Sequence, residues 1–320
     1  MSIVERALEK VRARAKSEPS PASEAPAEID TSATRQEPAP SRRDHLDDPL
    51  SLTSRDLKAI VQLDLDRLRA TGRLPSLEMA SQTEDEIRRI KWPLLKAING
   101  AEGVRPARSN VILVTSALPG EGKTFTSLNL ALSIVRDREM RVVLVDGDVA
   151  RPGLTPSLGL EGRAGLNDVL EDLDRDVSTV TYQTDVEGLF FVPAGKWHAH
   201  APEFFAGSRM PQVIEALSRR VGHGVVIFDS PPLLATNEAQ VATRFAGQVL
   251  IVVRAGTTEH QVVLDAIALV DKGAPVSAVL NRCEPSVLNR YYGRYYYGYG
   301  YGYYGNKTDA GPGNRGMVEE

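Results

Sequence analysis

The chain has 320 residues, of which 42% are hydrophobic and 25% charged, as expected for one globular domain with extensions. Lys and Arg total 38 against 42 Asp and Glu, and this net charge of −4 gives no general reason to expect a nucleic-acid partner. The single cysteine, Cys283, cannot form an internal disulfide, which favours a reducing compartment. The N-terminus lacks the apolar core of a signal peptide, and the apolar runs are far shorter than the ~20 residues that span a bilayer, so we expect a cytoplasmic protein.

The first third of the chain predicts helices joined by a linker. Apolar residues recur at helical spacing in residues 1–16, which indicates an amphipathic helix that either docks on a partner or membrane surface or caps the protein's own surface. Residues 17–49 are rich in Pro, Ser, Ala and Glu, a composition that predicts a disordered linker. Residues 50–109 form a helical lead-in, with helices expected at 55–70 and 83–99.

Residues 110–284 alternate short apolar runs with helical segments. The apolar runs predict buried strands at 111–116, 141–146, 225–230, 248–254 and 276–281. Helices are expected between several of them, at 124–137, 209–220 and 259–272. This alternation predicts an α/β domain with a mainly parallel sheet covered by helices on both faces, which binds ligands at the carboxyl ends of its strands.

The composition changes again in residues 285–320. Glycines separate the aromatic residues there and disfavour regular structure, so we expect a mobile tail. The tail holds nine of the ten tyrosines of the chain, namely Tyr291, Tyr292, Tyr295, Tyr296, Tyr297, Tyr299, Tyr301, Tyr303 and Tyr304.

A phosphate-binding loop is predicted at residues 117–124, ALPGEGKT, between the strand at 111–116 and the helix that follows. Its glycines allow backbone N–H groups to converge on phosphate oxygens, and the helix N-terminus favours an anion. Lys123 is expected to bridge the β- and γ-phosphates and Thr124 to bind Mg²⁺. The alternative, a simple glycine-containing turn, fits poorly with the strand before it and the helix after it.

Two acidic motifs follow at the ends of later strands. Asp146 and Asp148 come directly after one strand, and two carboxylates at this spacing can face one metal site. Asp148 is also compatible with a helix or turn cap. Asp229 ends the run VVIFD, where a carboxylate typically acts on the metal side of a nucleotide site, directly or through water. Alone, this Asp is compatible with an ordinary strand-to-turn exit.

These three motifs, in this order and with the tyrosine-rich tail, resemble the bacterial tyrosine kinase family over about residues 83–305. The resemblance implies a P-loop NTPase core and a tyrosine autokinase that uses ATP and Mg²⁺ to phosphorylate the nine tail tyrosines. The opening MSIVERALEK and the stretch EIRRIKWPLL (86–95) are more narrowly similar to autokinases associated with exopolysaccharide and exosortase gene clusters. A role in exopolysaccharide biosynthesis or export is implied in turn.

The resemblance also implies a set of site residues. The catalytic residues are Lys123, Asp146, Asp148 and Asp229, and the metal ligands are Thr124, Asp148 and Asp229. The nucleotide-binding residues are Pro119, Gly120, Glu121, Gly122, Lys123, Thr124 and Phe125, with Asn281 and Arg282 beside the adenine. Asn281 is also compatible with a plain turn residue.

Partners are implied by the same resemblance. Family members build a ring of subunits through a helix with Glu-x-x-Arg-x-x-Arg or Lys, and the nearest match here is Asp85, Arg88 and Lys91, with Asp in place of Glu. A homo-oligomer, a membrane polysaccharide co-polymerase that activates the enzyme at the inner face of the membrane, and a tyrosine phosphatase are expected as partners.

Two other functions remain as alternatives. A partition-type or division-site ATPase has the same core, but it typically carries a second lysine five residues before the conserved one, where this chain has Leu118. A non-enzymatic adaptor with an adhesive Tyr/Gly tail is the other, and the intact set of Lys123, Thr124, Asp146 and Asp229 argues against it.

Overall fold

A computed structural model describes residues 60–99, 106–137, 140–198 and 200–283. The predicted helix at 1–16, the linker at 17–49 and the tyrosine-rich tail at 285–320 lie outside the described residues. The chain divides into two units, Met1–Asn281 and Arg282–Glu320, and the architecture that follows is that of the first.

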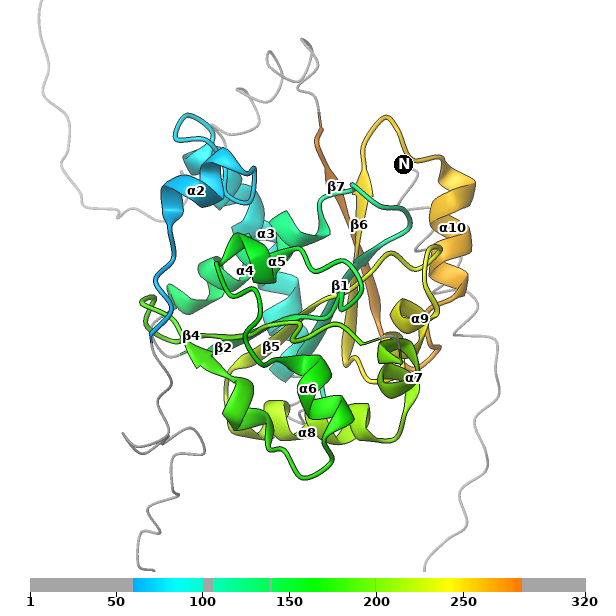
Figure 1. The fold of residues 1–320 in the computed structure, drawn as a ribbon. Coiled ribbons are helices and arrows are strands. Elements are labelled where there is room, and N and C mark those ends of the chain that lie inside the picture. Colours follow the sequence, from blue (N-terminus) through cyan, green and yellow to red (C-terminus); the bar gives the residue numbers. More distant parts are fainter. Residues whose placement is uncertain (1–59, 100–105, 138–139, 199, 284–320) are drawn as a thin grey trace, which may run out of the picture. The chain divides into compact units, whose positions relative to one another are not determined.

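The core of this unit is a seven-stranded sheet (Figure 1), with strand order β3-β4-β2-β5-β1-β6-β7. Only β3 and β4 pair antiparallel, and every other neighbouring pair of strands is parallel. The strands are β1 (Val111–Ser116), β2 (Val142–Asp146), β3 (Tyr182–Gln183), β4 (Leu189–Val192), β5 (Val225–Asp229), β6 (Gln248–Arg254) and β7 (Val276–Asn281). The mainly parallel α/β sheet expected from the sequence is therefore confirmed.

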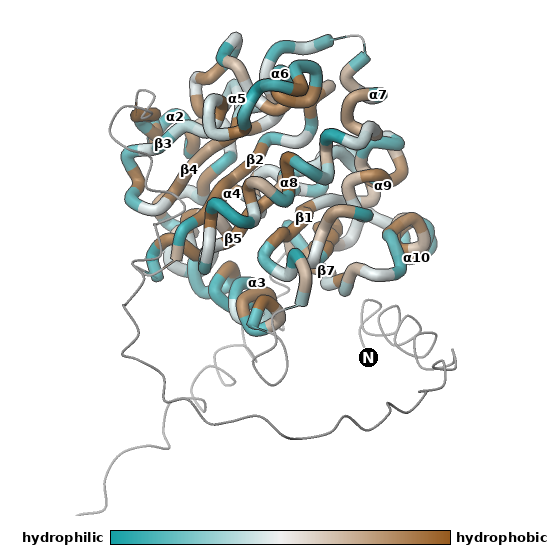
Figure 2. Tube along the Cα trace, turned by 90° about the horizontal axis from the view of Figure 1, so that it is seen from below, coloured by the Kyte–Doolittle hydropathy of each residue, from teal (hydrophilic) through white to brown (hydrophobic). Residues whose placement is uncertain are grey.

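Helices cover both faces of the sheet, and the hydrophobic residues concentrate on the strands between them (Figure 2). Those on one face are α2 (Leu65–Ala70), α3 (Ala80–Asn99), α4 (Lys123–Val135) and α5 (Leu154–Ser157). Those on the other face are α6 (Leu166–Glu171), α7 (Ala201–Ala206), α8 (Arg209–Arg220), α9 (Asn237–Thr243) and α10 (His260–Ala268), with the 3₁₀ turn η2 (Val177–Val180) beside them.

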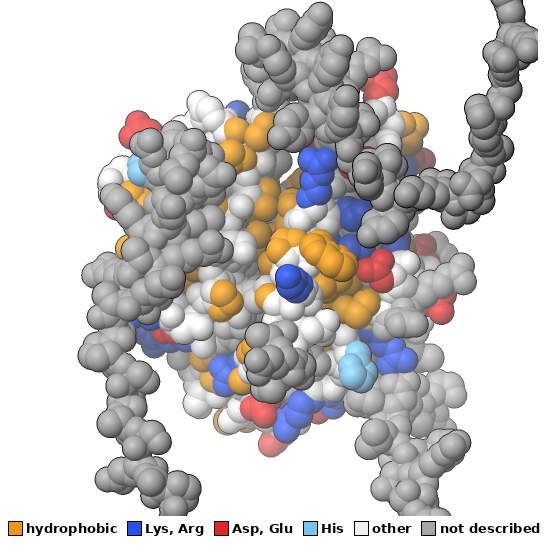
Figure 3. All heavy atoms as spheres, turned by 180° about the vertical axis from the view of Figure 1, so that it is seen from behind, with side chains coloured by type: hydrophobic (Ala, Val, Ile, Leu, Met, Phe, Trp, Pro, Cys, Tyr) orange, Lys and Arg blue, Asp and Glu red, His pale blue; other side chains and the backbone are white. Residues whose placement is uncertain are grey.

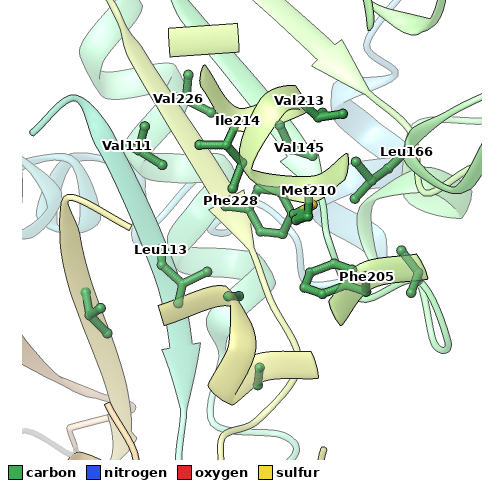
Figure 4. Close-up of a cluster of buried hydrophobic side chains, with 14 of the residues drawn as sticks. Val111, Leu113, Val145, Leu166, Phe205, Met210, Val213, Ile214, Val226 and Phe228 are labelled. Atoms are coloured by element: carbon green, nitrogen blue, oxygen red, sulfur yellow. The ribbon is translucent and has the colours of Figure 1, made fainter. Parts of the chain in front are cut away.

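Alternate residues of the strands pack into two separate hydrophobic cores, one on each face of the sheet. In β1, for example, Leu113 packs in the core under α6–α10, whereas Ile112 packs under α3 and α4. Figure 4 shows the first core, where the ring of Phe205 from α7 meets that of Phe228 from β5 edge-on, with centroids 6.0 Å apart. These buried runs explain why the strands could be recognised as continuous apolar segments.

Several predicted boundaries are confirmed by the structure. The strands predicted at 111–116, 248–254 and 276–281 and the helix at 209–220 have the predicted limits. The helix expected at 55–70 is wrong in part: α2 is its only described helical segment, and residue 61 instead forms a β-bridge with Thr184. The strands β3 and β4 and the short helices α5, α6, α7 and α9 were not predicted.

The expected oligomer-contact residues on α3 do not share one face. Asp85 and Arg88 are exposed and pair with each other at 3.2 Å, but Lys91 is buried and its ammonium binds Asp137 at 3.0 Å and the carbonyl oxygen of Ser133 at 3.1 Å. Residues six apart on a helix differ by about 120° in direction, so Lys91 points toward α4. The prediction that it lies on the surface with Asp85 and Arg88 is wrong.

The molecular surface carries some hydrophobic side chains. On the face turned away in Figure 1, such side chains lie among those of Lys and Arg (Figure 3). Trp92 on α3 is 72% exposed and follows Asp85 and Arg88 at helical spacing, so it extends their outward stripe. Across the part of the chain that the structure describes, no helix combines the length and apolar character needed to cross a membrane.

Phe205 offers a test of the core in Figure 4. It is fully buried, so Phe205→Ala should lower the free energy of unfolding by about 3–5 kcal/mol through lost burial and a residual cavity. Leu173→Ala, at a side chain that is 68% exposed, is the control and should change it by less than about 0.5 kcal/mol. Urea unfolding followed by circular dichroism measures both, and similar values for the two variants would contradict this packing.

Candidate active site

The predicted loop at 117–124 leaves β1 and enters α4, at the carboxyl edge of the sheet. Gly120 and Gly122 have φ of 80° and 101°, a backbone region that side chains disfavour, and α4 begins at Lys123 without a side-chain cap. Its first N–H groups are therefore available for an anion. Pro119 and Gly120 are exposed at the mouth of the loop, and Phe125 is half-buried in the first turn of α4.

Glu121 holds this loop in place from within. Its side chain is 1% exposed, and its carboxylate accepts a hydrogen bond from the backbone N–H of Leu118 at 2.7 Å. It also accepts bonds from the backbone N–H of Arg254 at 3.1 Å and from the hydroxyl of Thr258. The side chain of Glu121 thus ties the start of the loop to the segment between β6 and α10.

Asn281 and Arg282, expected beside the adenine, fall in different units. The side-chain amide of Asn281, at the end of β7, donates to the carbonyl oxygen of Glu121 at 2.9 Å and lies against Gly122. A Cβ on Gly122 would come within 1.9 Å of that amide nitrogen. Arg282 is the first residue of the second unit and has a left-handed backbone with φ of 56°.

Asp146 is fully buried at the end of β2 and is bonded on one side only. Its Oδ2 accepts three hydrogen bonds: from the N–H of Leu154 at 3.0 Å, and from the N–H and hydroxyl of Thr155 at 2.7 and 2.8 Å. Its Oδ1 has no partner within the described residues. Burial raises the pKa of Asp146 to about 6, although the bonds from Thr155 oppose that rise.

Asp229 lies beside Asp146, because the register of β5 against β2 pairs these two residues. Its Oδ1 accepts a hydrogen bond from the hydroxyl of Ser127 on α4 at 3.0 Å. Burial, with the charge of Asp146 next to it, raises the pKa of Asp229 to about 7, while bonds from the hydroxyls of Thr124 and Ser127 oppose the rise. A buried pair of carboxylates with raised pKa values is typical of a functional site.

Lys123 and Asp148 complete the group. Burial lowers the pKa of the Lys123 ammonium, which the nearby charges of Asp229 and Asp148 partly offset. Burial likewise raises the pKa of Asp148, whose Oδ1 accepts a hydrogen bond from the N–H of Arg151 at 3.1 Å. Asp148 therefore caps a turn, as the alternative reading of the sequence allowed, and also contributes charge to the site.

The donor set suits a hard divalent cation. The carboxylates of Asp229 and Asp148 and the hydroxyl of Thr124 are oxygen donors at one edge of the sheet. In the described ranges, no group of three or more His, Cys, Asp or Glu side chains forms a self-sufficient metal cage. Mg²⁺ usually needs none, because it binds through one or two carboxylates together with phosphate oxygens and water.

Sequence reasoning missed two supporting residues. Thr155 saturates one oxygen of Asp146 and also accepts the N–H of Ala194 at 2.9 Å, and Ser127 orients Asp229. Ser127 lies one helical turn after Lys123, so its spacing was a usable signal. Thr155 comes close to Asp146 only through the path of the chain between β2 and α5, which no local pattern reveals.

Asp229→Asn tests the electrostatic strain of the pair. The pKa of Asp229 is raised in the folded protein, so its charge destabilises the ligand-free protein above about pH 7, and this penalty fades as the pH falls toward 3.8. We expect Asp229→Asn to stabilise the ligand-free protein by a few kcal/mol at pH 8 and by less than half as much at pH 5. Thermal and urea unfolding at both pH values measure the difference.

The exposed Asp174→Asn is the matched control for this change and should behave like the wild type at both pH values. An Asp229→Asn variant that is less stable than the wild type at pH 8 would contradict the expectation that the charge of Asp229 destabilises the folded protein.

Gly122→Ala tests how closely the loop packs on β7. It should cost more folding free energy than Gly120→Ala, because both positions have positive φ but a Cβ on Gly120 meets nothing within 4 Å. The strained backbone alone costs about 1–2 kcal/mol, and the collision with Asn281 adds about 1–3 kcal/mol. The double variant Gly122→Ala/Asn281→Ala removes the collision, so it should lose only the cost of the strained backbone at residue 122. Equal unfolding free energies for the single variants Gly122→Ala and Gly120→Ala would count against this contact.

Comparison with known proteins places this site in a family. No protein-family profile matches the chain. A putative tyrosine-protein kinase, AmsA of Erwinia amylovora, is 31% identical over 175 residues, which cover 54% of this chain and 24% of the relative. The tyrosine-protein kinase YwqD of Bacillus subtilis is 28% identical over 177 residues, which cover 52% of this chain and 73% of the relative.

Solved structures agree with the sequence relatives. The kinase domain of the Escherichia coli tyrosine kinase ETK superposes with a TM-score of 0.53 and 25% identity, covering 63% of this chain and 78% of that one. The chain spans 20% to 32% of the length of the first four curated relatives that it matches. On these matches, the chain is homologous to the kinase domains of bacterial tyrosine kinases.

Proposed function

We propose that this protein is an autokinase that transfers the γ-phosphoryl group of MgATP to tyrosines in its own C-terminal tail. The observation that carries the proposal is the convergence of Lys123, Thr124, Asp146 and Asp229 at one edge of the sheet, around a loop with exposed glycine backbone. These are the parts that phosphoryl transfer needs, because catalysis of this reaction consists mainly of positioning and charge neutralisation.

Each residue has a definable role in the reaction. The loop amides and Lys123 would hold the triphosphate, while Thr124 and Asp229, with Asp148 beside them, would hold Mg²⁺, which would supply charge neutralisation to the phosphates. Asp146 presents its unpartnered Oδ1, which can orient the tyrosine hydroxyl and accept its proton. Burial makes this carboxylate a stronger base than a solvated aspartate, since its pKa is raised to about 6.

The acceptor follows from where the tyrosines lie in the chain. Nine of the ten are between 291 and 304, outside the described residues. The tenth, Tyr182, is buried in β3 with its hydroxyl donating to the carbonyl oxygen of Ala164 at 3.2 Å. A buried, bonded hydroxyl is a poor acceptor, so phosphorylation is expected in the tail, where each phosphate adds about −1.5 to −2 charges.

Self-association, regulation and biological role extend the proposal. The outward stripe of α3, with Asp85, Arg88 and Trp92, is the surface that we assign to contacts between subunits, and Lys91 acts within the subunit. A membrane polysaccharide co-polymerase as activator, a tyrosine phosphatase as antagonist and the control of exopolysaccharide synthesis or export complete the proposed setting, which rests on the resemblance of residues 1–10 and 86–95 to exopolysaccharide-associated autokinases.

Phosphopeptide mass spectrometry after incubation with ATP and Mg²⁺ tests the proposal. Wild-type protein should carry phosphotyrosine at 291–304, and Lys123→Met should carry none because the β- and γ-phosphates lose their cation. Tyr182→Phe is the matched control and should leave the extent of phosphorylation unchanged.

Steady ATP hydrolysis without phosphotyrosine, in the presence of a membrane co-polymerase as well as alone, would favour the partition-type ATPase. Tight self-association with neither hydrolysis nor phosphotyrosine would favour the non-enzymatic adaptor.

A further inference from the structure

We propose that Arg73, from the turn after α2, is a catalytic residue that contacts the transferred phosphoryl group. It lies 50 residues before Lys123, in the lead-in rather than in any of the three nucleotide motifs. This inference rests on the proposed function in that it names a further residue of the same site. Four features of the structure support it: an anchored backbone, a guided side chain, proximity to Thr124 and unused charge.

The backbone of Arg73 is fixed relative to the phosphate-binding loop. Gly72, with φ of 67°, turns the chain back after α2, and the N–H of Arg73 donates to the carbonyl oxygen of Leu68 at 2.8 Å. The carbonyl oxygen of Arg73 accepts a bond at 2.9 Å from the side-chain amide of Asn129, which also bonds to the carbonyl oxygen of Phe125 at 2.7 Å. Arg73 is thereby tied to the first turns of the helix that begins at Lys123.

The side chain of Arg73 is directed across α5 toward the metal side of the site. Its Nε donates to the hydroxyl of Ser157 at 3.0 Å, and that hydroxyl donates to the carbonyl oxygen of Gly153 at 2.6 Å. A Cβ placed on Gly153 would lie 3.6 Å from Nη2 of Arg73 and 2.9 Å from the hydroxyl oxygen of Thr124. The guanidinium and the proposed magnesium ligand are therefore both within contact range of one point beside Gly153.

The charge of Arg73 is not used elsewhere. Within the described residues, Arg73 makes no ion pair with any carboxylate, and its only side-chain hydrogen bond engages Nε, so both terminal nitrogens are left to donate. The site that it borders holds Asp146 and Asp229, and a bound triphosphate adds further negative charge. A planar guanidinium suits this role because it can bind two phosphoryl oxygens at once.

The chemistry assigns Arg73 to the step of transfer. The bond from the γ-phosphorus to the bridging oxygen breaks with its electron pair staying on ADP, a bond from the tyrosine oxygen forms, and the phenolic proton passes to Asp146. Charge spreads over the three equatorial oxygens at that moment, and an arginine that contacts them lowers the barrier. Arginines with this role raise kcat by about 10³–10⁵-fold.

The alternative is that Arg73 only holds α5 in place, and the chain offers two controls for it. Arg67, on α2, binds the same segment through the carbonyl oxygen of Pro156 at 3.0 Å. Ser157→Ala removes the hydroxyl that Arg73 binds but keeps the guanidinium. If the role of Arg73 is purely structural, Arg67→Ala and Ser157→Ala should therefore have the same effect on ligand affinity as Arg73→Ala.

The test compares the ground state with a mimic of transfer in the full chain with Mg²⁺. Isothermal titration calorimetry gives the affinities for ADP and for ADP with aluminium fluoride, which mimics the transferred phosphoryl group. For Arg73→Ala and Arg73→Lys we expect ADP affinity within about twofold of the wild type, and a loss of aluminium fluoride affinity on the order of 10²-fold or more for Arg73→Ala. Arg67→Ala and Ser157→Ala should keep both affinities within about threefold, and guanidinium added to Arg73→Ala should restore part of the single-turnover rate.

Equal losses of ADP and aluminium fluoride affinity in Arg73→Ala, or the same losses in Arg67→Ala or Ser157→Ala, would overturn the proposal. Equal affinities of the wild type for ADP and for ADP with aluminium fluoride would also overturn it, because the protein would then make no contact that is specific to the transferred phosphoryl group. Neither affinity measurement involves a tyrosine, so failure of the tail-kinase proposal and failure of this one are separable: the first appears in the phosphopeptides and the second in the calorimetry.

Discussion

The register between β2 and β5 sets Asp146 beside Asp229, both almost fully buried at the ends of adjacent parallel strands. Two carboxylates in this position repel each other and lose their hydration, which is why both pKa values are raised. The folded chain offsets this with hydroxyl and backbone donors, but Lys123 is the only cation of the phosphate-binding loop. The charge balance of the site therefore favours an additional cation, in keeping with the proposed binding of Mg²⁺ with a nucleotide.

The hydrogen bonds that stabilise the buried carboxylate of Asp146 also determine where the neighbouring segment α5 lies. Three donors meet on Oδ2 of Asp146, and all three belong to the first two residues of α5, so α5 must begin beside the end of β2. That placement brings Gly153 against Thr124 and Ser157 within reach of Arg73. A lead-in residue distant in sequence thus borders the phosphate site because one carboxylate oxygen requires α5 to lie there.

The local sequence was sufficient to predict a helix or strand wherever one hydrophobic pattern dominated the segment. The strands β1, β6 and β7 were predicted to the residue because each is a short, mainly apolar run, and β1 and β6 are buried on both faces of the parallel sheet. β3 and β4 escaped notice because they are two and four residues long, and α5 because it has a single turn. Lys91 was misplaced for a different reason. Its spacing from Arg88 allowed an exposed position, and only its long-range partner Asp137, at the end of α4, shows that it is turned inward.

The same topology bears on how the tail could reach the site. β1, β2, β5, β6 and β7 are mutually parallel, so their carboxyl ends share one edge of the sheet, and β7 ends there at Asn281. The tail therefore starts from the edge that holds the phosphate-binding loop, and the side chain of Asn281 is bonded to Glu121 within that loop. Nine residues lie between Asn281 and Tyr291 in the sequence, and the ten steps from one Cα to the next span at most about 35 Å when fully extended. The tyrosines that we propose as acceptors, from Tyr291 to Tyr304, follow Asn281 at successively longer separations along the sequence.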